Sequence, residues 1–429
     1  MKNNVKNLIE FIDHSPSCFH VIENARKQFL EHGFTELEEK EYWDLEEGKS
    51  YFVTRNGSSI IAFHLPKKDF QGFHIVASHS DSPTYRIKEQ PEMSVEKHYT
   101  KLNIERYGGM IPETWFDRPL SVAGRIIIEE NGQIKDQLVN VDRDLMIIPN
   151  LAIHMSRSSN ESKQLNPQKD LLPLCGGNLT KDGFEEMIAK ESGVEKEDIL
   201  SYDLFLYNRM RGTTLGINEE FVAAPKLDDL ECAYSSIEGM LNAKLSKDYV
   251  TVCAVFDNEE VGSGTKQGAG STFFPEVLKR ISYLCGKNEE EYYMAVADSF
   301  MLSADNAHAV HPNHQDKTDP TNRPYINEGI VLKYNASQKY TTDANSAALV
   351  KYLCKKEKIK CQVFFNRSDM LGGSTLGNIL TGQVSIKAAD IGLPQLSMHS
   401  TYETAGCKDL DDMITLMGSF YELGKEVQI

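Results

Sequence analysis

Histidine and carboxylate side chains follow several strand-like runs of this 429-residue chain, and these residues could do chemistry. Ligands of open α/β sheets bind beyond the carboxyl ends of the strands, so side chains at those ends are the first candidates for a site. A further candidate, Asp228, lies where a β-rich stretch gives way to alternating strands and helices. The positions that follow apolar runs are His79-Ser-Asp81 after 72–78, Asp257-Asn-Glu259-Glu260 after 250–256, Ser303-Ala-Asp305 after 292–297, and Met398-His399 after 394–396.

Two imidazoles and at least three carboxylates form a donor set for divalent cations. Imidazole and carboxylate bind zinc, and one carboxylate can bridge two metal ions about 3.5 Å apart. In an extended segment residues i and i+2 point to the same side, so Asp81 could accept the free ring N–H of His79. Neighbours on an extended chain point apart, which would let Glu260 bind a metal while Glu259 faces the attacking water as general base.

Each of these signals has a simpler interpretation. A single His-x-Asp is more often a structural pair, and adjacent glutamates usually form a solvated surface. Asp305 could be a turn residue and His399 a hydrogen-bonded core histidine. Their joint placement after strand-like runs favours the metal site over four independent coincidences.

Local patterns predict the elements that must position these residues. Apolar residues recur at helical spacing over 5–12 and 21–34, which predicts two amphipathic helices. Asn56-Gly57 lies between two strand-like runs and predicts a type I′ hairpin turn. After residue 226, strand-like runs at 249–256, 292–297, 330–334 and 362–366 alternate with helical stretches, and a last helix over 409–427 places Met413, Met417 and Phe420 on a core-facing side.

The residue pattern in the middle of the chain differs from the pattern on either side. β-branched runs surround the Asn131-Gly132 turn, and helical periodicity is weak before Asp182. We therefore expect an α/β fold with a mixed sheet flanked by helices, in which residues 1–87 and 225–429 form the site-bearing domain. Residues 88–224 are predicted to be an inserted β-rich domain, in keeping with a length that suggests two or three domains.

Composition excludes several partners. A formal net charge of −17 would repel phosphate backbones and anionic membranes, so neither nucleic acid nor membrane is expected as a partner. Residues 1–12 lack the apolar block of a signal peptide, and no apolar run approaches transmembrane length. Eight cysteines without a Cys-x-x-Cys pair predict free thiols in a reducing cytoplasm.

Several motifs together resemble the aspartyl aminopeptidase family of dinuclear metallopeptidases. The resemblance spans nearly the whole chain, with the motifs in order. They are His79-Ser-Asp-Ser-Pro, Trp115-Phe-Asp-Arg-Pro-Leu-Ser, Pro149-Asn-Leu-Ala-Ile-His154, Asp257-Asn-Glu-Glu-Val-Gly-Ser, Ser303-Ala-Asp-Asn-Ala-His-Ala-Val-His-Pro and Gln395-Leu-Ser-Met-His-Ser.

The resemblance assigns a role to each candidate. It implies a first metal held by His79 and Asp305 and a second held by Glu260 and His399, and Asp228 would bridge the two ions. By the same resemblance, Glu259 is the general base and Asp81 orients His79. The remaining assignments are Lys333 as the cation that selects an acidic substrate side chain, and His154 as a residue that the inserted dimerisation or lid domain presents to a neighbouring subunit.

The implied activity is that of a metalloaminopeptidase that removes N-terminal residues, preferably Asp or Glu, with metal-activated water and a Glu base. Two divalent ions per subunit are expected. Zinc is the expected metal, and manganese and cobalt are the alternatives. The resemblance also implies a dodecamer built from dimers. The alternatives are a related deacylase or neutral aminopeptidase with another pocket, and a non-catalytic scaffold protein.

Two departures from the family pattern concern the pocket. The family commonly has Arg-Leu-Asp-Asn-Leu where this chain has Lys226-Leu-Asp-Asp-Leu, which adds the charge of Asp229 beside Asp228. The segment Arg367-Ser-Asp-Met-Leu-Gly-Gly-Ser-Thr-Leu-Gly lacks the family's Pro and Cys, so side-chain preference could differ. Its Gly372-Gly373 offers main-chain N–H groups to a substrate, although glycine pairs more often mark a turn.

Overall fold

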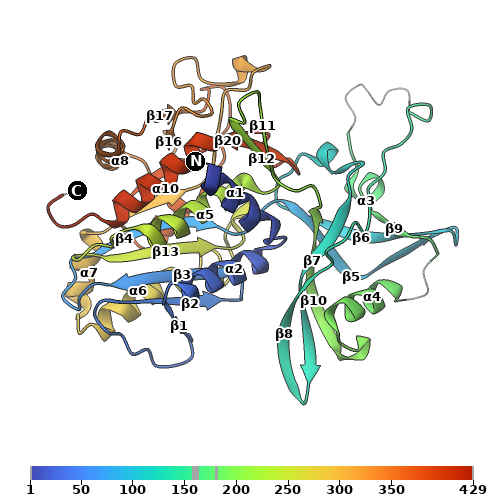
Figure 1. Ribbon diagram of the computed structural model, residues 1–429, viewed down its shortest axis with the longest axis horizontal. Coiled ribbons are helices and arrows are strands. Elements are labelled where there is room, and N and C mark those ends of the chain that lie inside the picture. The colour runs from blue at the N-terminus through green and yellow to red at the C-terminus, as the bar shows by residue number, and fades with distance from the viewer. Residues whose placement is uncertain (1, 157–163, 179–181, 428–429) are drawn as a thin grey trace.

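The computed structural model describes residues 2–156, 164–178 and 182–427, which form three β-sheets with helices packed around them. Figure 1 shows two lobes side by side, a larger one with the longest helices and a smaller one built around the sheet of β5 to β10. Among the described residues no helix is long and apolar enough to cross a membrane.

A nine-stranded mixed sheet forms the centre of the larger lobe. Its four middle strands, in the order β13-β4-β14-β18, run parallel to their neighbours, while β3 and β16 on either side are antiparallel to them. The predicted α/β class with a mixed sheet is therefore confirmed. In spatial order the strands are β1 (Thr35–Leu37), β2 (Lys49–Arg55), β3 (Ser59–Leu65), β13 (Val250–Phe256), β4 (Phe73–His79), β14 (Phe300–Ala304), β18 (Lys387–Gly392), β16 (Ile330–Lys333) and β17 (Cys361–Phe364).

Helices cover both faces of this sheet and enclose two hydrophobic cores. The predicted N-terminal helices, the last helix and the Asn56-Gly57 turn are confirmed, and both turn residues have positive φ. Met413, Met417 and Phe420 are buried as expected. One face carries α1 (Lys2–Asp13), α2 (Cys18–Glu31), α5 (Leu227–Asn242), α8 (Ala344–Glu357) and α10 (Cys407–Tyr421), and the other carries α6 (Phe273–Leu284), α7 (Glu289–Ala297) and α9 (Leu376–Gln383).

The strand predicted over 292–297 is wrong, because this run belongs to helix α7. A short apolar run cannot be assigned to strand or helix by periodicity alone. Here a capping box favours the helix. The Asn288 side chain accepts from the Glu291 N–H, and the Glu291 side chain accepts in return from the Asn288 N–H. The strand that leads to Asp305 is the next apolar run, β14.

A six-stranded antiparallel sheet forms the smaller lobe around a third hydrophobic core. The Asn131-Gly132 turn joins β7 to β8, and both of its residues have positive φ. This sheet begins at Thr84 and ends at Asn208, so the division at 88 and 224 remains a proposal. Its elements are β8 (Gln133–Asn140), β7 (Leu120–Glu130), β10 (Ile199–Asn208), β5 (Thr84–Val95), β6 (Tyr99–Tyr107) and β9 (Leu174–Gly176), with α3 (Pro167–Asp170) and α4 (Gly183–Ser192) beside it.

A five-stranded sheet and four 3₁₀ turns complete the fold. The sheet leads the chain into α5 through β12 and carries the loop after β19. Its strands are β11 (Thr213–Leu215), β12 (Phe221–Ala224), β20 (Glu403–Gly406), β19 (Pro394–Leu396) and β15 (Ala307–His308). The turns are η1 (Pro112–Trp115), η2 (Lys196–Asp198), η3 (Glu259–Val261) and η4 (Gln315–Lys317).

Candidate metal centre

Three of the candidate segments meet because their strands are parallel neighbours. Strand β4 lies between β13 and β14, and His79 pairs directly with Phe256 at the carboxyl end of β13. The side chains that follow β13 and β14 therefore reach the same sheet edge as His79. Asp305 comes one residue after β14, and the Glu259-Glu260 pair follows β13.

Asp228 and His399 reach the same place from other elements. Lys226 adopts a left-handed conformation before α5, and Asp228 has non-helical dihedral angles at the start of that helix. His399 lies in the loop between β19 and β20 and has a φ of +67°. Glu403 fixes both segments, because its carboxylate accepts from the Asp228 N–H at 2.9 Å and from the His399 N–H at 2.7 Å.

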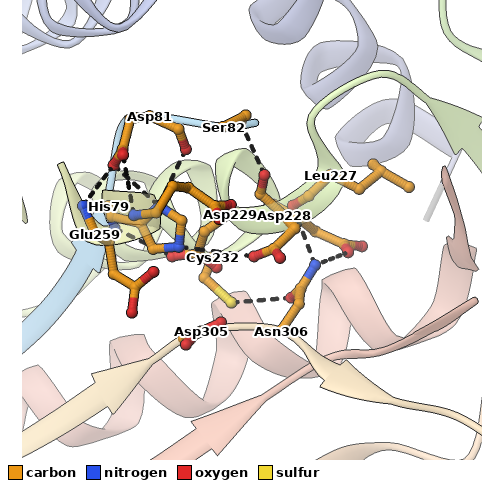
Figure 2. A network of polar contacts seen from close by, with 12 residues as sticks. His79, Asp81, Ser82, Leu227, Asp228, Asp229, Cys232, Glu259, Asp305 and Asn306 are labelled. Carbon is orange, nitrogen blue, oxygen red and sulfur yellow. Dashed lines mark hydrogen bonds and ion pairs between the residues drawn. The ribbon is translucent and has the colours of Figure 1, made fainter. Parts of the chain in front are cut away.

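The five residues predicted to bind metal, together with Asp229, form two groups that share Asp228. Ligand atoms within each group lie within 4.8 Å of one another. One Asp228 oxygen lies 3.7 Å from His79 Nε2, and the other lies 3.3 Å from His399 Nε2. His399 Nε2 is also 3.4 Å from a Glu260 oxygen. The groups are His79, Asp228, Asp229 and Asp305, shown with Asp81 and Glu259 in Figure 2, and Asp228, Glu260 and His399.

Three buried carboxylate oxygens in these groups have no hydrogen-bond donor among the described residues. They belong to Asp228, Asp229 and Glu260. A buried acceptor without a partner costs free energy, whereas a cation at each group would satisfy all three. The donor set and these oxygens therefore fit divalent metal ions.

The ring of His79 is oriented by contacts with Asp81, two residues further along the chain. Its Nδ1 lies 3.1 Å from the main-chain carbonyl of Asp81 and 3.4 Å from that residue's carboxylate. Nδ1–H donation toward Asp81 leaves the Nε2 lone pair facing Asp228. The expected contact with the Asp81 side chain is thus present, but the shorter contact is to its carbonyl oxygen.

The expectation that Glu259 and Glu260 lie on an extended segment is wrong. They form turn η3 after Asn258, which is left-handed, and the Asp81 carboxylate holds this turn by accepting from both main-chain N–H groups at 3.1 Å. The turn places Glu260 in a ligand group and Glu259 in the adjoining cavity. Aspartate favours such a turn because its two carboxylate oxygens can accept from successive N–H groups.

The carboxyl groups of the turn have raised pKa values. Burial raises the pKa of Glu259 to about 8; the His79 ring acts in the opposite direction, and the Asp305 and Asp81 carboxylates add to the rise. Burial and the Asp228 charge likewise raise the pKa of Glu260. Bound cations would oppose these shifts, because a nearby positive charge stabilises the carboxylate.

A cavity of about 330 Å³ adjoins the two groups. Among its lining residues in the described parts of the chain, Lys333 is the only lysine or arginine, and its side chain is 2% exposed. Lys333 Nζ donates to the Asp305 carbonyl at 2.6 Å and lies 3.6 Å from the Asp305 carboxylate. The lining consists of His79, Asp228, Glu259, Asp305, Asn306, Ala307, His308, Lys333, Tyr340, Phe364, Gly373, Ser374, Thr375, Met398 and His399.

The remaining residues named from the sequence lie partly at the cavity and partly away from it, and one site residue was not predicted. Gly373 lines the cavity, whereas Gly372 packs against the Asn366 side chain. His154 lies in an exposed turn outside both ligand groups. The sequence reasoning missed Glu403 as a site residue because a single buried glutamate four positions after His399 follows no metal-ligand spacing.

Fold and donor set together define a metallohydrolase of the α/β class. A family model described as aminopeptidase I zinc metalloprotease (M18) matches residues 11–421. The chain belongs to this M18 family of zinc aminopeptidases, which are hydrolases. The resemblance noted from the motifs is thereby confirmed at the level of the family.

Relatives and solved structures agree with this assignment. The chain is 45% identical to a probable M18 family aminopeptidase 2 of Clostridium novyi, over 99% of this chain and 100% of the relative. It superposes on Ape4, from a cryo-EM structure of the Ape4 and Nbr1 complex, with a TM-score of 0.95 and 36% identity, covering 98% of this chain and 85% of that one. The mApe1 dodecamer of S. cerevisiae gives 0.85 and 26%, covering 98% and 97%.

Proposed function

We propose that this protein removes N-terminal residues, preferably Asp or Glu, from peptides, using two divalent ions, of which zinc is the expected metal, and Glu259 as general base. The observation that carries the proposal is Asp228, whose two oxygens face two different ligand groups. His79, Asp305 and Asp228 would hold one ion and Glu260, His399 and Asp228 the other, and bound ions would supply Lewis acidity to a water and to the scissile carbonyl.

The chain's own residues have defined tasks in this scheme. Glu259 takes the proton of the attacking water and delivers it to the leaving amine, since it lines the cavity beside the two ligand groups but belongs to neither of them. The carboxylates around the cavity bind the free α-amino group, which limits cleavage to the first residue. Lys333 pairs with an acidic first side chain.

Replacing Glu259 by glutamine tests the base. We expect the Glu259→Gln variant to keep both ions and lose turnover by a factor on the order of 100 to 10,000. Glu231→Gln is the control, because Glu231 is 0% exposed and burial also raises its pKa to about 8, but it does not line the cavity. Equal loss of metal and activity in Glu259→Gln would contradict the assigned role.

Two measurements separate this proposal from its alternatives. Turnover of Asp-, Glu-, Leu- and Ala-anilides against acylated amino acids distinguishes an acidic aminopeptidase from a neutral aminopeptidase or a deacylase. Metal analysis combined with a peptidase assay distinguishes an enzyme from a scaffold protein. Retention of metal without any peptidase activity would favour the scaffold.

We also propose a homododecamer built from dimers, in which residues 88–224 form the dimerisation domain. The support is the likeness to the mApe1 dodecamer and the exposed apolar side chains that flank His154, namely Leu151, Ile153 and Met155. In this assembly His154 contacts the substrate site of a neighbouring subunit. Native mass spectrometry tests the assembly, and loss of turnover in His154→Ala without loss of assembly tests the residue.

We propose the cytoplasm as the location of this protein. The free state of all eight cysteines supports this location, because disulfides are rare there.

A further inference from the structure

Residues 107–111 leave the smaller lobe at the end of β6 and contact both halves of the metal centre. The Tyr107 hydroxyl donates to the Asp81 carboxylate at 2.6 Å, and the Ile111 N–H donates to the His399 carbonyl at 3.0 Å. Between them, Gly108 lies against Glu260. One short segment of the smaller lobe therefore touches a residue beside each part of the site.

Tyr107 is brought to Asp81 by strand pairing. It lies opposite Thr84 at the start of β5, three residues after Asp81. Its ring packs edge-to-face on Phe205 of β10 at 5.7 Å between centroids, and its oxygen accepts from the Asn258 side chain at 2.8 Å. The ring is thus fixed by the six-stranded sheet, while the hydroxyl contacts Asp81 and Asn258, the residue that precedes turn η3.

The Asp81 carboxylate connects Tyr107 to three parts of the site. One oxygen accepts from the Tyr107 hydroxyl and the Glu260 N–H; the other accepts from the Glu259 N–H and lies 3.4 Å from His79 Nδ1. An O–H to carboxylate bond of this length is charge-assisted and among the stronger hydrogen bonds in proteins. The Tyr107 hydroxyl consequently limits rotation of a carboxylate that orients both the turn and the His79 ring.

Gly108 allows the close approach of this segment to Glu260. Its φ is +79°, and a Cβ at this position would lie 3.1 Å from the Glu260 Cβ and 3.4 Å from the Glu260 carbonyl oxygen. Both the backbone conformation and the short contact disfavour any larger residue. A side chain here would displace Glu260 or the segment itself.

We propose that residues 107–111 are a positioning segment through which the smaller lobe holds the metal centre, with Tyr107 as a positioning residue for Asp81. In this arrangement the six-stranded sheet contributes to the site of its own subunit. The turnover part of the test rests on the proposed aminopeptidase function, whereas the metal-binding part does not.

Tyr107→Phe removes only the hydroxyl. We expect kcat to fall about tenfold or more with KM nearly unchanged and both ions retained, because a group that orients catalytic residues has lost a hydrogen bond. Tyr202→Phe is the matched control, since Tyr202 lies in the same sheet and donates to the Lys88 carbonyl at 2.9 Å, away from the site. A kcat of Tyr107→Phe within about twofold of the parent, or an equal fall in the control, would overturn the proposal.

Gly108→Ala tests the approach to Glu260 without any substrate. We expect the affinity for one of the two ions to fall about tenfold or more, measured by chelator competition, while the other ion is retained. Gly132→Ala carries the matching backbone strain, with a φ of +75° and no atom within 4 Å of the added Cβ, and should bind both ions like the parent. Parent-like ion affinity in Gly108→Ala would overturn the proposal. Weaker binding in a protein without peptidase activity would instead reject the proposed function alone.

Discussion

Replacing Lys333 by methionine removes the positive charge proposed to select acidic substrates. Burial alone would lower the pKa of Lys333, but the Asp305 carboxylate raises it above its ordinary value, so the ammonium stays charged in the cavity. Methionine keeps much of the apolar side-chain volume without the charge. The change therefore tests the charge rather than the shape of the site.

The expected effect follows from the burial of Lys333, which is 2% exposed. Removing one partner of a buried, hydrogen-bonded charge pair costs roughly 2–5 kcal/mol. The lower value, about 2 kcal/mol, corresponds to a loss of about 30-fold in kcat/KM for an Asp substrate relative to a Leu substrate.

The assay compares kcat/KM for Asp-, Glu-, Leu- and Ala-anilides in the parent and in Lys333→Met. The ratio between substrates is an internal control, because Lys333 also contacts Asp305 and any loss of metal lowers all four rates together. Lys339→Met provides the matched charge removal, since Lys339 donates to the Gly372 carbonyl at 2.9 Å but does not line the cavity. An Asp-to-Leu ratio within about threefold of the parent would refute the selection role of Lys333.

Two further predictions concern metal binding and acid stability. Asp229→Asn keeps an acceptor for the His79 N–H but loses a charge within a ligand group, so affinity for one ion should fall about tenfold. Asp257→Asn, outside both groups, should retain the parent affinity in the same chelator competition. Burial lowers the pKa of His74 to about 3. Since unfolding restores a value near 6.5, the metal-free protein should lose about 1.4 kcal/mol of unfolding free energy per unit of pH between pH 6.5 and pH 3 through this residue. Urea unfolding at several pH values should show a shallower loss for His74→Phe, and identical slopes would contradict the assignment.

Local features were predictable because they depend on neighbours in sequence. Asn56-Gly57 supplies the positive φ of its hairpin turn, and the spacing of apolar residues defines α1 and α2. The strand at 292–297 was not predictable in this way, because a short apolar run has no distinctive period and the capping residue Asn288 decided for a helix. The same holds for turn η3, whose shape depends on the distant Asp81.

By itself the sequence determined which residue types stand at the strand ends, and its motifs determined the family. Tertiary structure decided which of those ends are neighbours: β4 lies between β13 and β14, and this order brings His79, Glu260 and Asp305 within reach of Asp228. It also decided that the Glu403 carboxylate accepts hydrogen bonds from the Asp228 and His399 N–H groups, and that Tyr107 of another sheet donates a hydrogen bond to Asp81. Spacing along the chain sets periodicity and turns, whereas contacts between residues far apart in sequence arise only from strand pairing and packing of the whole fold.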